Sequence, residues 1–136
     1  MNTMSEPKRI LLVEDEAFIR ELYSLFLKED NYIVDEAPDG EVAVEAFKTN
    51  HYSLVLLDIL LPEKDGMVVL DEVKRIDNTV PVVMLTNLAQ DDLVKKAFDL
   101  GAAGYLLKAR ISKKELLAEV KGFVEPSMIP SSQPQP

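Results

Sequence analysis

Short apolar runs alternate with longer, helix-patterned segments five times along this chain of 136 residues. The runs are RILLV, YIVDEA, SLVLLD, PVVMLT and GYLLK, which begin at residues 9, 32, 53, 81 and 104. The segments after them repeat apolar residues every three or four positions, at 17–29, 40–49, 66–76, 90–100 and 112–124. Strands that alternate with helices predict an α/β fold, in which a doubly wound parallel sheet is covered by helices on both faces.

The helix-patterned segments also predict which side chains face the core. These are Phe18, Leu22, Leu25 and Phe26 in the first segment, and Val42, Ala43, Ala46 and Phe47 in the second. Gly101 follows the fourth segment as a good C-terminal cap. Ser112 and Glu115 open the fifth segment at the spacing of a capping box.

The composition predicts one globular domain over residues 8–125, with an N-terminal arm over 1–7. The stretch 126–136 holds four of the eight prolines and no charge, so we expect a disordered tail or the stump of a linker. No cysteine is present, which excludes a disulfide framework and a thiolate metal site. No apolar signal core precedes the domain and ILLV is too short to span a membrane, so we expect a cytoplasmic protein.

Charge is distributed unevenly along the chain. The net charge of −9 makes a general affinity for nucleic acid unfavourable. Residues 93–123 nevertheless hold seven Lys or Arg against three Asp or Glu, a net charge of +4, which leaves −13 for the remainder. This asymmetry indicates either a basic partner-facing surface on the last two helices or an ordinary solvated helix face, and the sequence favours neither.

The carboxyl ends of the predicted strands carry the residues of a candidate site. These are Glu14 and Asp15 after the first strand, Asp58 after the third, Thr86 after the fourth and Lys108 after the fifth. Five strands commonly take the order 2-1-3-4-5, and ligands bind where this order reverses, between the first and third strands. We therefore expect all five side chains to converge on one crevice, while His51, the only histidine, is expected at the surface.

Three carboxylates in one crevice repel one another, so either their pKa values rise or a cation joins them. Oxygen ligands without a nearby His or Cys favour a hard cation. Mg²⁺ is the first expectation, Mn²⁺ is an alternative, and Ca²⁺ is less favoured than either. An acidic cluster with Mg²⁺, the lysine and a hydroxyl suits a phosphoryl group. The apolar run before Asp58 would then hold this carboxylate on a rigid strand end as the nucleophile.

From about Lys8 to Phe123, the sequence resembles the receiver domain of two-component response regulators of the chemotaxis-receiver type. Four motifs carry the resemblance in order: LLVEDE, LLDILLPEKDG, MLTN and GAAGYLLKA. It implies the flavodoxin-like (βα)5 fold. It also implies a phosphoacceptor, not an enzyme acting on an external substrate, that receives a phosphoryl group on Asp58 from a histidine kinase or phosphotransfer protein.

The resemblance implies a role for each residue of the crevice. Asp15 and Asp58 would ligate Mg²⁺ together with the backbone carbonyl of Leu60. Glu14 would act on the metal directly or through water, and Lys108 would pair with the phosphoryl oxygens.

The resemblance further implies a two-state switch built from Thr86 and Tyr105. Thr86 would hydrogen-bond the phosphoryl group, Tyr105 would turn inward behind it, and the switch would regulate a homodimer or an output protein through the last two helices.

Two residues next to the predicted site depart from the family pattern. Ala109 follows the lysine where a cis-linked proline is usual, so this loop is either strained or trans and rearranged. Asn87 stands where a smaller residue is commoner, which would narrow phosphodonor access.

Three other functions compete with this one. A phosphatase of the haloacid dehalogenase class needs a second aspartate two residues after the nucleophile, where this chain has Leu60. A nucleotide-binding domain needs a glycine-rich loop after the first strand, where this chain has VEDEAF. A pseudo-receiver, an interaction module not regulated by phosphorylation, would lack part of the acid and lysine set, and it stays the alternative.

Overall fold

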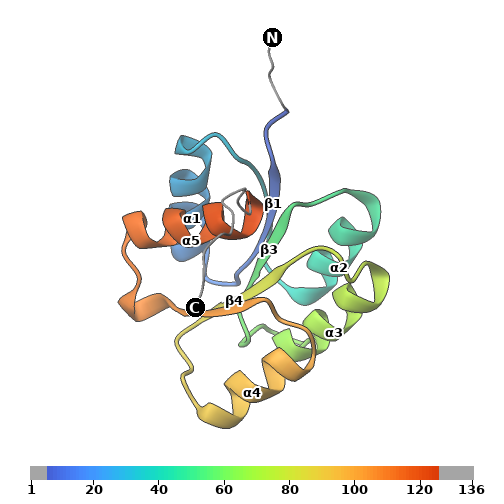
Figure 1. Ribbon diagram of the computed structural model, residues 1–136. Helices are drawn as coiled ribbons and strands as arrows, with labels where there is room; N and C mark the ends of the chain where they lie inside the picture. Colours follow the sequence, from blue (N-terminus) through green and yellow to red (C-terminus); the bar gives the residue numbers. More distant parts are fainter. Residues whose placement is uncertain (1–5, 126–136) are drawn as a thin grey trace, which may run out of the picture.

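Five strands and five α-helices alternate strictly along the computed structural model, which describes residues 6–125 (Figure 1). The strands are β1 (Arg9–Val13), β2 (Ile33–Ala37), β3 (Leu54–Leu57), β4 (Val82–Thr86) and β5 (Gly104–Leu107). The helices are α1 (Ala17–Glu29), α2 (Gly40–Thr49), α3 (Gly66–Ile76), α4 (Asp91–Asp99) and α5 (Lys113–Val124). A short 3-10 helix, η1 (Lys108–Arg110), joins β5 to α5. The predicted tail and most of the predicted N-terminal arm lie outside the described residues.

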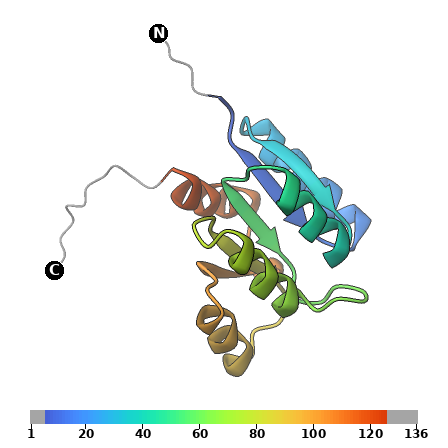
Figure 2. The same ribbon diagram turned by 90° about the vertical axis from the view of Figure 1, so that its right-hand side faces the viewer.

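The strands form one parallel sheet in the order β2-β1-β3-β4-β5, which confirms the predicted fold class and strand order. Helices α1 and α5 cover one face of this sheet, and α2, α3 and α4 cover the other (Figures 1 and 2). The order reverses between β1 and β3, where the backbone N–H of Asp58 donates to the Val13 carbonyl at 3.1 Å. The expected crevice therefore lies beyond the carboxyl ends of these two strands.

Each face of the sheet has its own apolar core. Every residue of β3 and β4 is buried, as expected of central strands covered on both sides. Phe47, Leu70 and Ala97 pack from α2, α3 and α4 on one face, and Leu27 and Leu116 pack from α1 and α5 on the other. This double burial holds the strand ends rigid. No helix in residues 6–125 is both long and apolar enough to cross a bilayer.

The predicted inward face of α1 is only partly right: Leu22 and Phe26 are half-buried, and Phe26 packs against the core. Phe18 is 72% exposed and Leu25 is 52% exposed, whereas Tyr23, Ser24 and Leu27 are the buried residues of this helix. The inward stripe of α1 therefore includes the polar side chains of Tyr23 and Ser24. Apolar spacing alone did not reveal this.

The predicted face of α2 is partly right, and the helix ends agree with the sequence. Ala43 and Phe47 are buried, but Val42 is exposed and Val44 takes an inward place instead. The capping box of α5 is formed, and Gly101 adopts a φ of +105° just after α4. His51 is exposed, as predicted.

Candidate functional site

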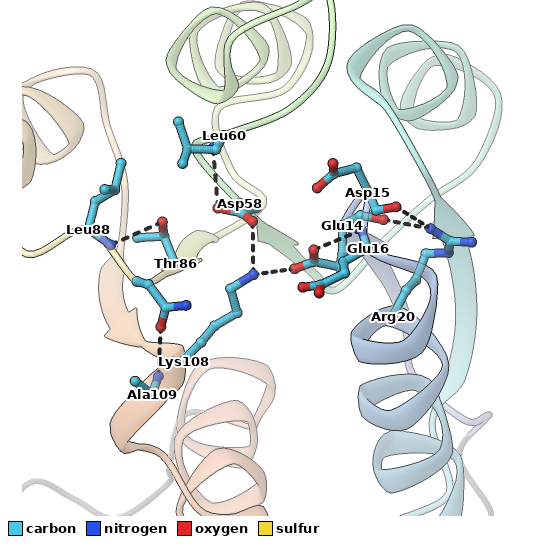
Figure 3. A network of polar contacts seen from close by, with 11 residues as sticks. Glu14, Asp15, Glu16, Arg20, Asp58, Leu60, Thr86, Leu88, Lys108 and Ala109 are labelled. Carbon is cyan, nitrogen blue, oxygen red and sulfur yellow. Dashed lines mark hydrogen bonds and ion pairs between the residues drawn. The ribbon is translucent and has the colours of Figure 1, made fainter.

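Three carboxylates meet at the carboxyl edge of the sheet, as the sequence predicts (Figure 3). Glu14 and Asp15 lie in the loop after β1, Asp58 follows β3, and oxygens of all three lie within 4.8 Å of one another. Glu14 is 2% exposed and Asp58 is 6% exposed, whereas Asp15 is open to solvent. The cluster is therefore buried on one side and accessible on the other.

Lys108 enters this cluster from the end of β5. Its Nζ donates to Glu14 Oε1 at 2.6 Å and to Asp58 Oδ2 at 2.9 Å (Figure 3). Burial by itself would lower the pKa of Lys108, but the two carboxylate hydrogen bonds raise it above its usual value. Burial raises the pKa of Glu14 in spite of the Lys108 hydrogen bond. Two of the three acids thus share one ammonium group, and the cluster keeps surplus negative charge.

The loop that carries the first two acids is held by a residue that the sequence analysis missed. Arg20 Nη1 donates to the Glu14 carbonyl at 2.8 Å, and Arg20 Nε donates to Glu36 Oε1 at 3.3 Å. The backbone N–H of Glu16 also donates to Glu14 Oε2 at 3.0 Å. These bonds fix the loop after β1 against α1 and β2. A lone arginine one helical turn after an acidic triplet was the signal available in the sequence.

Asp58 is fixed by the loop that follows it. Its Oδ1 accepts the backbone N–H of Leu60 at 3.2 Å. The backbone N–H of Gly66, the first residue of α3, donates to the Ile59 carbonyl at 2.8 Å. A Cβ on Gly66 would collide with the Asp58 carbonyl oxygen and stand 2.6 Å from the Ile59 Cα. A glycine is therefore required where α3 packs against the backbone of the acidic residue.

The fifth predicted site residue, Thr86, lies beside the cluster. It is 1% exposed at the end of β4, and its hydroxyl accepts the Leu88 N–H at the long distance of 3.4 Å. Within residues 6–125 this hydroxyl makes no hydrogen bond to Asp58 or Lys108. Tyr105 is half-buried and donates its hydroxyl to the Leu88 carbonyl at 2.6 Å. Burial, followed by the charge of Asp58, raises the pKa of Tyr105.

The peptide bond after Lys108 decides between the two loop conformations that the sequence left open, a strained loop and a trans, rearranged loop. No cis peptide bond occurs between residues 6 and 125, so the Lys108–Ala109 bond is trans and the chain turns directly into η1. Lys108, predicted as the last residue of the fifth strand, is instead the first residue of this 3-10 helix. The Asn87 side chain is directed at the loop, where its Oδ1 accepts the Ala109 N–H at 2.8 Å.

A family model described as the response regulator receiver domain matches residues 10–121 of this chain. The chain belongs to this family. Nothing in the comparisons favours a pseudo-receiver, and the complete set of acids and lysine lies together in the structure.

Relatives and solved structures agree with this membership. The chain is 40% identical to the chemotaxis protein CheY of Halobacterium salinarum over 101 residues, which cover 74% of this chain and 84% of that protein. It is 44% identical to the transcriptional regulatory protein PdtaR of Mycobacterium tuberculosis over 105 residues, 75% of this chain but only 50% of PdtaR. A complex of CheX, CheY, BeF3 and Mg²⁺ from Borrelia burgdorferi matches with a TM-score of 0.80 and 28% identity, over 85% of this chain and 88% of that one.

The comparisons also fix the general chemistry. Receiver domains bind Mg²⁺ at an acidic site, and the carboxylates of Glu14, Asp15 and Asp58 form an acidic cluster in this chain. Their oxygens are hard donors, which suit Mg²⁺. Receiver domains also interact with histidine kinases and output domains, although this chain spans only about half the length of PdtaR and of ResD from Bacillus subtilis.

Proposed function

We propose that Asp58 of this receiver domain is the residue that accepts the phosphoryl group. The observation that carries the proposal is the position of its carboxylate, which is bonded to Lys108 at 2.9 Å and lies within 4.8 Å of the Glu14 and Asp15 oxygens. The Lys108 ammonium group beside this nucleophile, together with a Mg²⁺ ion held by the acids, would offset the negative charge of an incoming phosphoryl group. In transfer, an Asp58 oxygen bonds to phosphorus as the P–N bond of a phosphohistidine breaks. The bonding electrons stay on the imidazole nitrogen, which takes up a proton.

The neighbours of Asp58 have two separate electrostatic roles, pairing with the phosphoryl oxygens and holding Mg²⁺. Lys108 already contacts Asp58 Oδ2, so its ammonium group is placed to pair with a phosphoryl oxygen on that carboxylate. Asp15, Asp58 and the backbone carbonyl of Leu60 would hold Mg²⁺, with Glu14 directly or through water. Mg²⁺ would neutralise charge on the transferring phosphoryl oxygens. The Borrelia CheY complex, which contains BeF3 and Mg²⁺, supports this assignment.

Thr86 and Tyr105 are the proposed switch. The Thr86 hydroxyl has only a 3.4 Å hydrogen bond from Leu88, so little opposes its rotation toward a phosphoryl oxygen. Tyr105 is held to the same residue by a 2.6 Å bond, so movement of the loop at Leu88 changes both side chains. The phosphoryl charge would bias the equilibrium between the two arrangements.

Replacement of Asp58 tests the phosphoacceptor. Asp58→Asn should abolish Mg²⁺-dependent incorporation of phosphate from a phosphohistidine donor or from acetyl phosphate, because an amide oxygen is a much weaker nucleophile. Intact-mass spectrometry reads the incorporation directly. Asp35→Asn is the matched control, since Asp35 is a half-buried acid that bonds to Arg9 on β1 outside the cluster. Incorporation into the Asp58→Asn protein at the native rate would contradict the assignment.

The exposed basic residues on α4, η1 and α5 are the proposed partner surface. They are Lys95, Lys96, Arg110, Lys113, Lys114 and Lys121. Lys95 bonds to Asp99 and Lys113 to Glu29, and the other four have no ion pair within residues 6–125. We expect phosphorylation to change a homodimer or output-protein contact here, as read by light scattering and partner pull-downs with and without beryllofluoride. No change in either, or contacts confined to α2 and α3, would contradict this surface.

A further inference from the structure

Two hydrogen bonds join the loop after β4 to residues on either side of Lys108. The Tyr105 hydroxyl donates to the Leu88 carbonyl at 2.6 Å, and the Ala109 N–H donates to Asn87 Oδ1 at 2.8 Å. Tyr105 precedes the lysine by three residues and Ala109 follows it directly. Residues before and after Lys108 in the sequence are therefore both hydrogen-bonded to the loop after β4.

The Ala109 N–H needs a partner from outside its own segment. It lies in the first turn of η1, where backbone N–H groups have no partner within the helix. Only a residue other than proline offers this donor, and the side-chain oxygen of Asn87 meets it at an ideal length. The two departures from the family pattern, at positions 87 and 109, are thus the two halves of one hydrogen bond.

The lysine has little tolerance for displacement. Its side chain is 10% exposed, and its Nζ must reach Glu14 at 2.6 Å and Asp58 at 2.9 Å at once. The side chain is long and flexible, so the position of its backbone decides whether both bonds form together. We infer that Asn87 is a positioning residue that fixes Lys108 for phosphoryl transfer through the Ala109 N–H. This inference rests on the proposed phosphoacceptor role of Asp58.

The bond also changes the interpretation of Asn87 as an obstacle to the donor. The Asn87 side chain, with its Oδ1 bonded to the Ala109 N–H, is directed toward η1. A positioning role predicts a change in the maximal rate of phosphorylation. A role in donor access predicts a change in the donor concentration that gives half of that rate.

The first experiment compares three variants with the wild type. Asn87→Leu removes the acceptor at nearly constant volume, Asn87→Asp keeps an acceptor oxygen, and Asn78→Leu is the matched control at an exposed asparagine in the turn before β4. With acetyl phosphate and Mg²⁺, Asn87→Leu should lower the maximal rate roughly three- to tenfold, the effect of losing about one hydrogen bond. The half-saturating donor concentration should stay constant, Asn87→Asp should recover most of the rate, and Asn78→Leu should match the wild type.

A double-mutant cycle then isolates the bond itself. Ala109→Pro removes the donor, so Asn87→Leu added to it should have no further effect on the rate. If the two single-variant reductions in rate multiply in the double variant, the inference is overturned. An unchanged rate in Asn87→Leu, or a change confined to the half-saturating donor concentration, would also overturn it. All of these outcomes presuppose a wild type that takes up phosphate.

Nuclear magnetic resonance of the unphosphorylated protein provides a readout that does not depend on Asp58 chemistry. The Ala109 amide and the Lys108 ammonium group should exchange slowly with solvent in the wild type and in Asn78→Leu, and faster in Asn87→Leu. Unchanged exchange of the ammonium group in Asn87→Leu would overturn the positioning role. A wild type that takes up no phosphate but shows the expected exchange would instead refute the proposed function and leave the positioning intact.

Discussion

Both ends of the sheet carry a network of charged side chains, but charges balance at the amino end and acids outnumber cations at the carboxyl end. Toward the amino end, Arg9 Nη1 donates to both oxygens of Asp35, at 3.1 and 3.0 Å, and the Tyr52 hydroxyl donates to the same carboxylate at 2.6 Å. One cation meets one anion, and a neutral donor completes the set. At the carboxyl end, Lys108 is the only cation within residues 6–125 that bonds to the carboxylates of the three-acid cluster.

Burial separates the two networks further. The Arg9 and Asp35 side chains are 38% and 32% exposed, whereas Lys108, Glu14 and Asp58 are 10%, 3% and 7% exposed. Water screens the balanced pair, while the surplus charge lies where water screens it least. The amino-end network can serve packing alone. The carboxyl-end network keeps unbalanced negative charge unless a further cation enters it, and such a cation would also offset the charge of an incoming phosphoryl group.

The largest expected effect comes from removing the cation at each end. Lys108→Met leaves two buried carboxylates unpaired and should lower the free energy of unfolding by about 3 kcal/mol or more without metal. Arg9→Met breaks a partly exposed pair and should cost about 1 kcal/mol at most. Urea unfolding near neutral pH with a chelator measures both. Equal losses would remove the distinction between the two ends.

Added Mg²⁺ should act on one end only. At a concentration one hundred times its Kd, the metal should stabilise the wild type by about 2.7 kcal/mol through mass action. Asp15→Asn should reduce this gain because it removes a proposed ligand, while Asp35→Asn should keep it in full. Urea unfolding with Mg²⁺ and with a chelator gives the difference. A metal response that Asp35→Asn abolishes and Asp15→Asn preserves would show that the cation binds elsewhere.

The acidic cluster could be predicted from the sequence because it follows from strong, local rules, and the strand order could be predicted because five parallel strands commonly adopt it. A fully apolar run such as residues 54–57 specifies a central strand, and parallel strands bring their carboxyl ends to one edge whatever the details of packing. The capping box at Ser112 and Glu115 needs only its own four residues. These signals do not depend on the rest of the fold.

The parts that could not be predicted depend on contacts between distant segments. The inward face of α1 is decided by how Tyr23 and Ser24 fit against the sheet, and apolar spacing pointed to Phe18 and Leu25 instead. The bond between Asn87 and Ala109 joins residues 22 positions apart, and neither an asparagine nor an alanine at these positions predicts it. Loop geometry of this kind follows from the packed fold and has no periodic signal.

Apolar side chains beside the carboxyl-end cluster should control how long the phosphoryl group survives. Leu60 and Leu88 lie two residues after Asp58 and Thr86, and neither can hydrogen-bond an attacking water. We expect slow loss of phosphate in the wild type and faster loss in Leu60→Asn and Leu88→Glu. A tenfold change corresponds to only about 1.4 kcal/mol of barrier.

Decay of the phosphorylated protein at fixed Mg²⁺ measures this effect in all three proteins. Leu60 is 62% exposed, so its replacement should not disturb the core and serves as the cleaner of the two variants. The rival explanation is that the trans Lys108–Ala109 loop loosens the phosphoryl contacts and sets the lifetime by itself. Fast decay in the wild type, unaltered by either substitution, would favour that explanation over the leucines.

The smallest expected effect lies at the amino end, where Tyr52→Phe removes the neutral donor and leaves the Arg9–Asp35 pair intact. Below pH 10.0, the ordinary pKa of tyrosine, the lost hydrogen bond should cost about 1 kcal/mol of unfolding free energy. Burial first, and the hydrogen bond to Asp35 second, raise the pKa of Tyr52 above that value. The folded protein therefore keeps the Tyr52 proton at a pH where the unfolded chain releases it. It follows that the wild-type advantage is complete below pH 10.0 and shrinks as the pH rises further. Urea unfolding of both proteins from about pH 8 to 11 should show two converging curves. Parallel curves would mean that Tyr52 titrates normally and that its bond to Asp35 is weak.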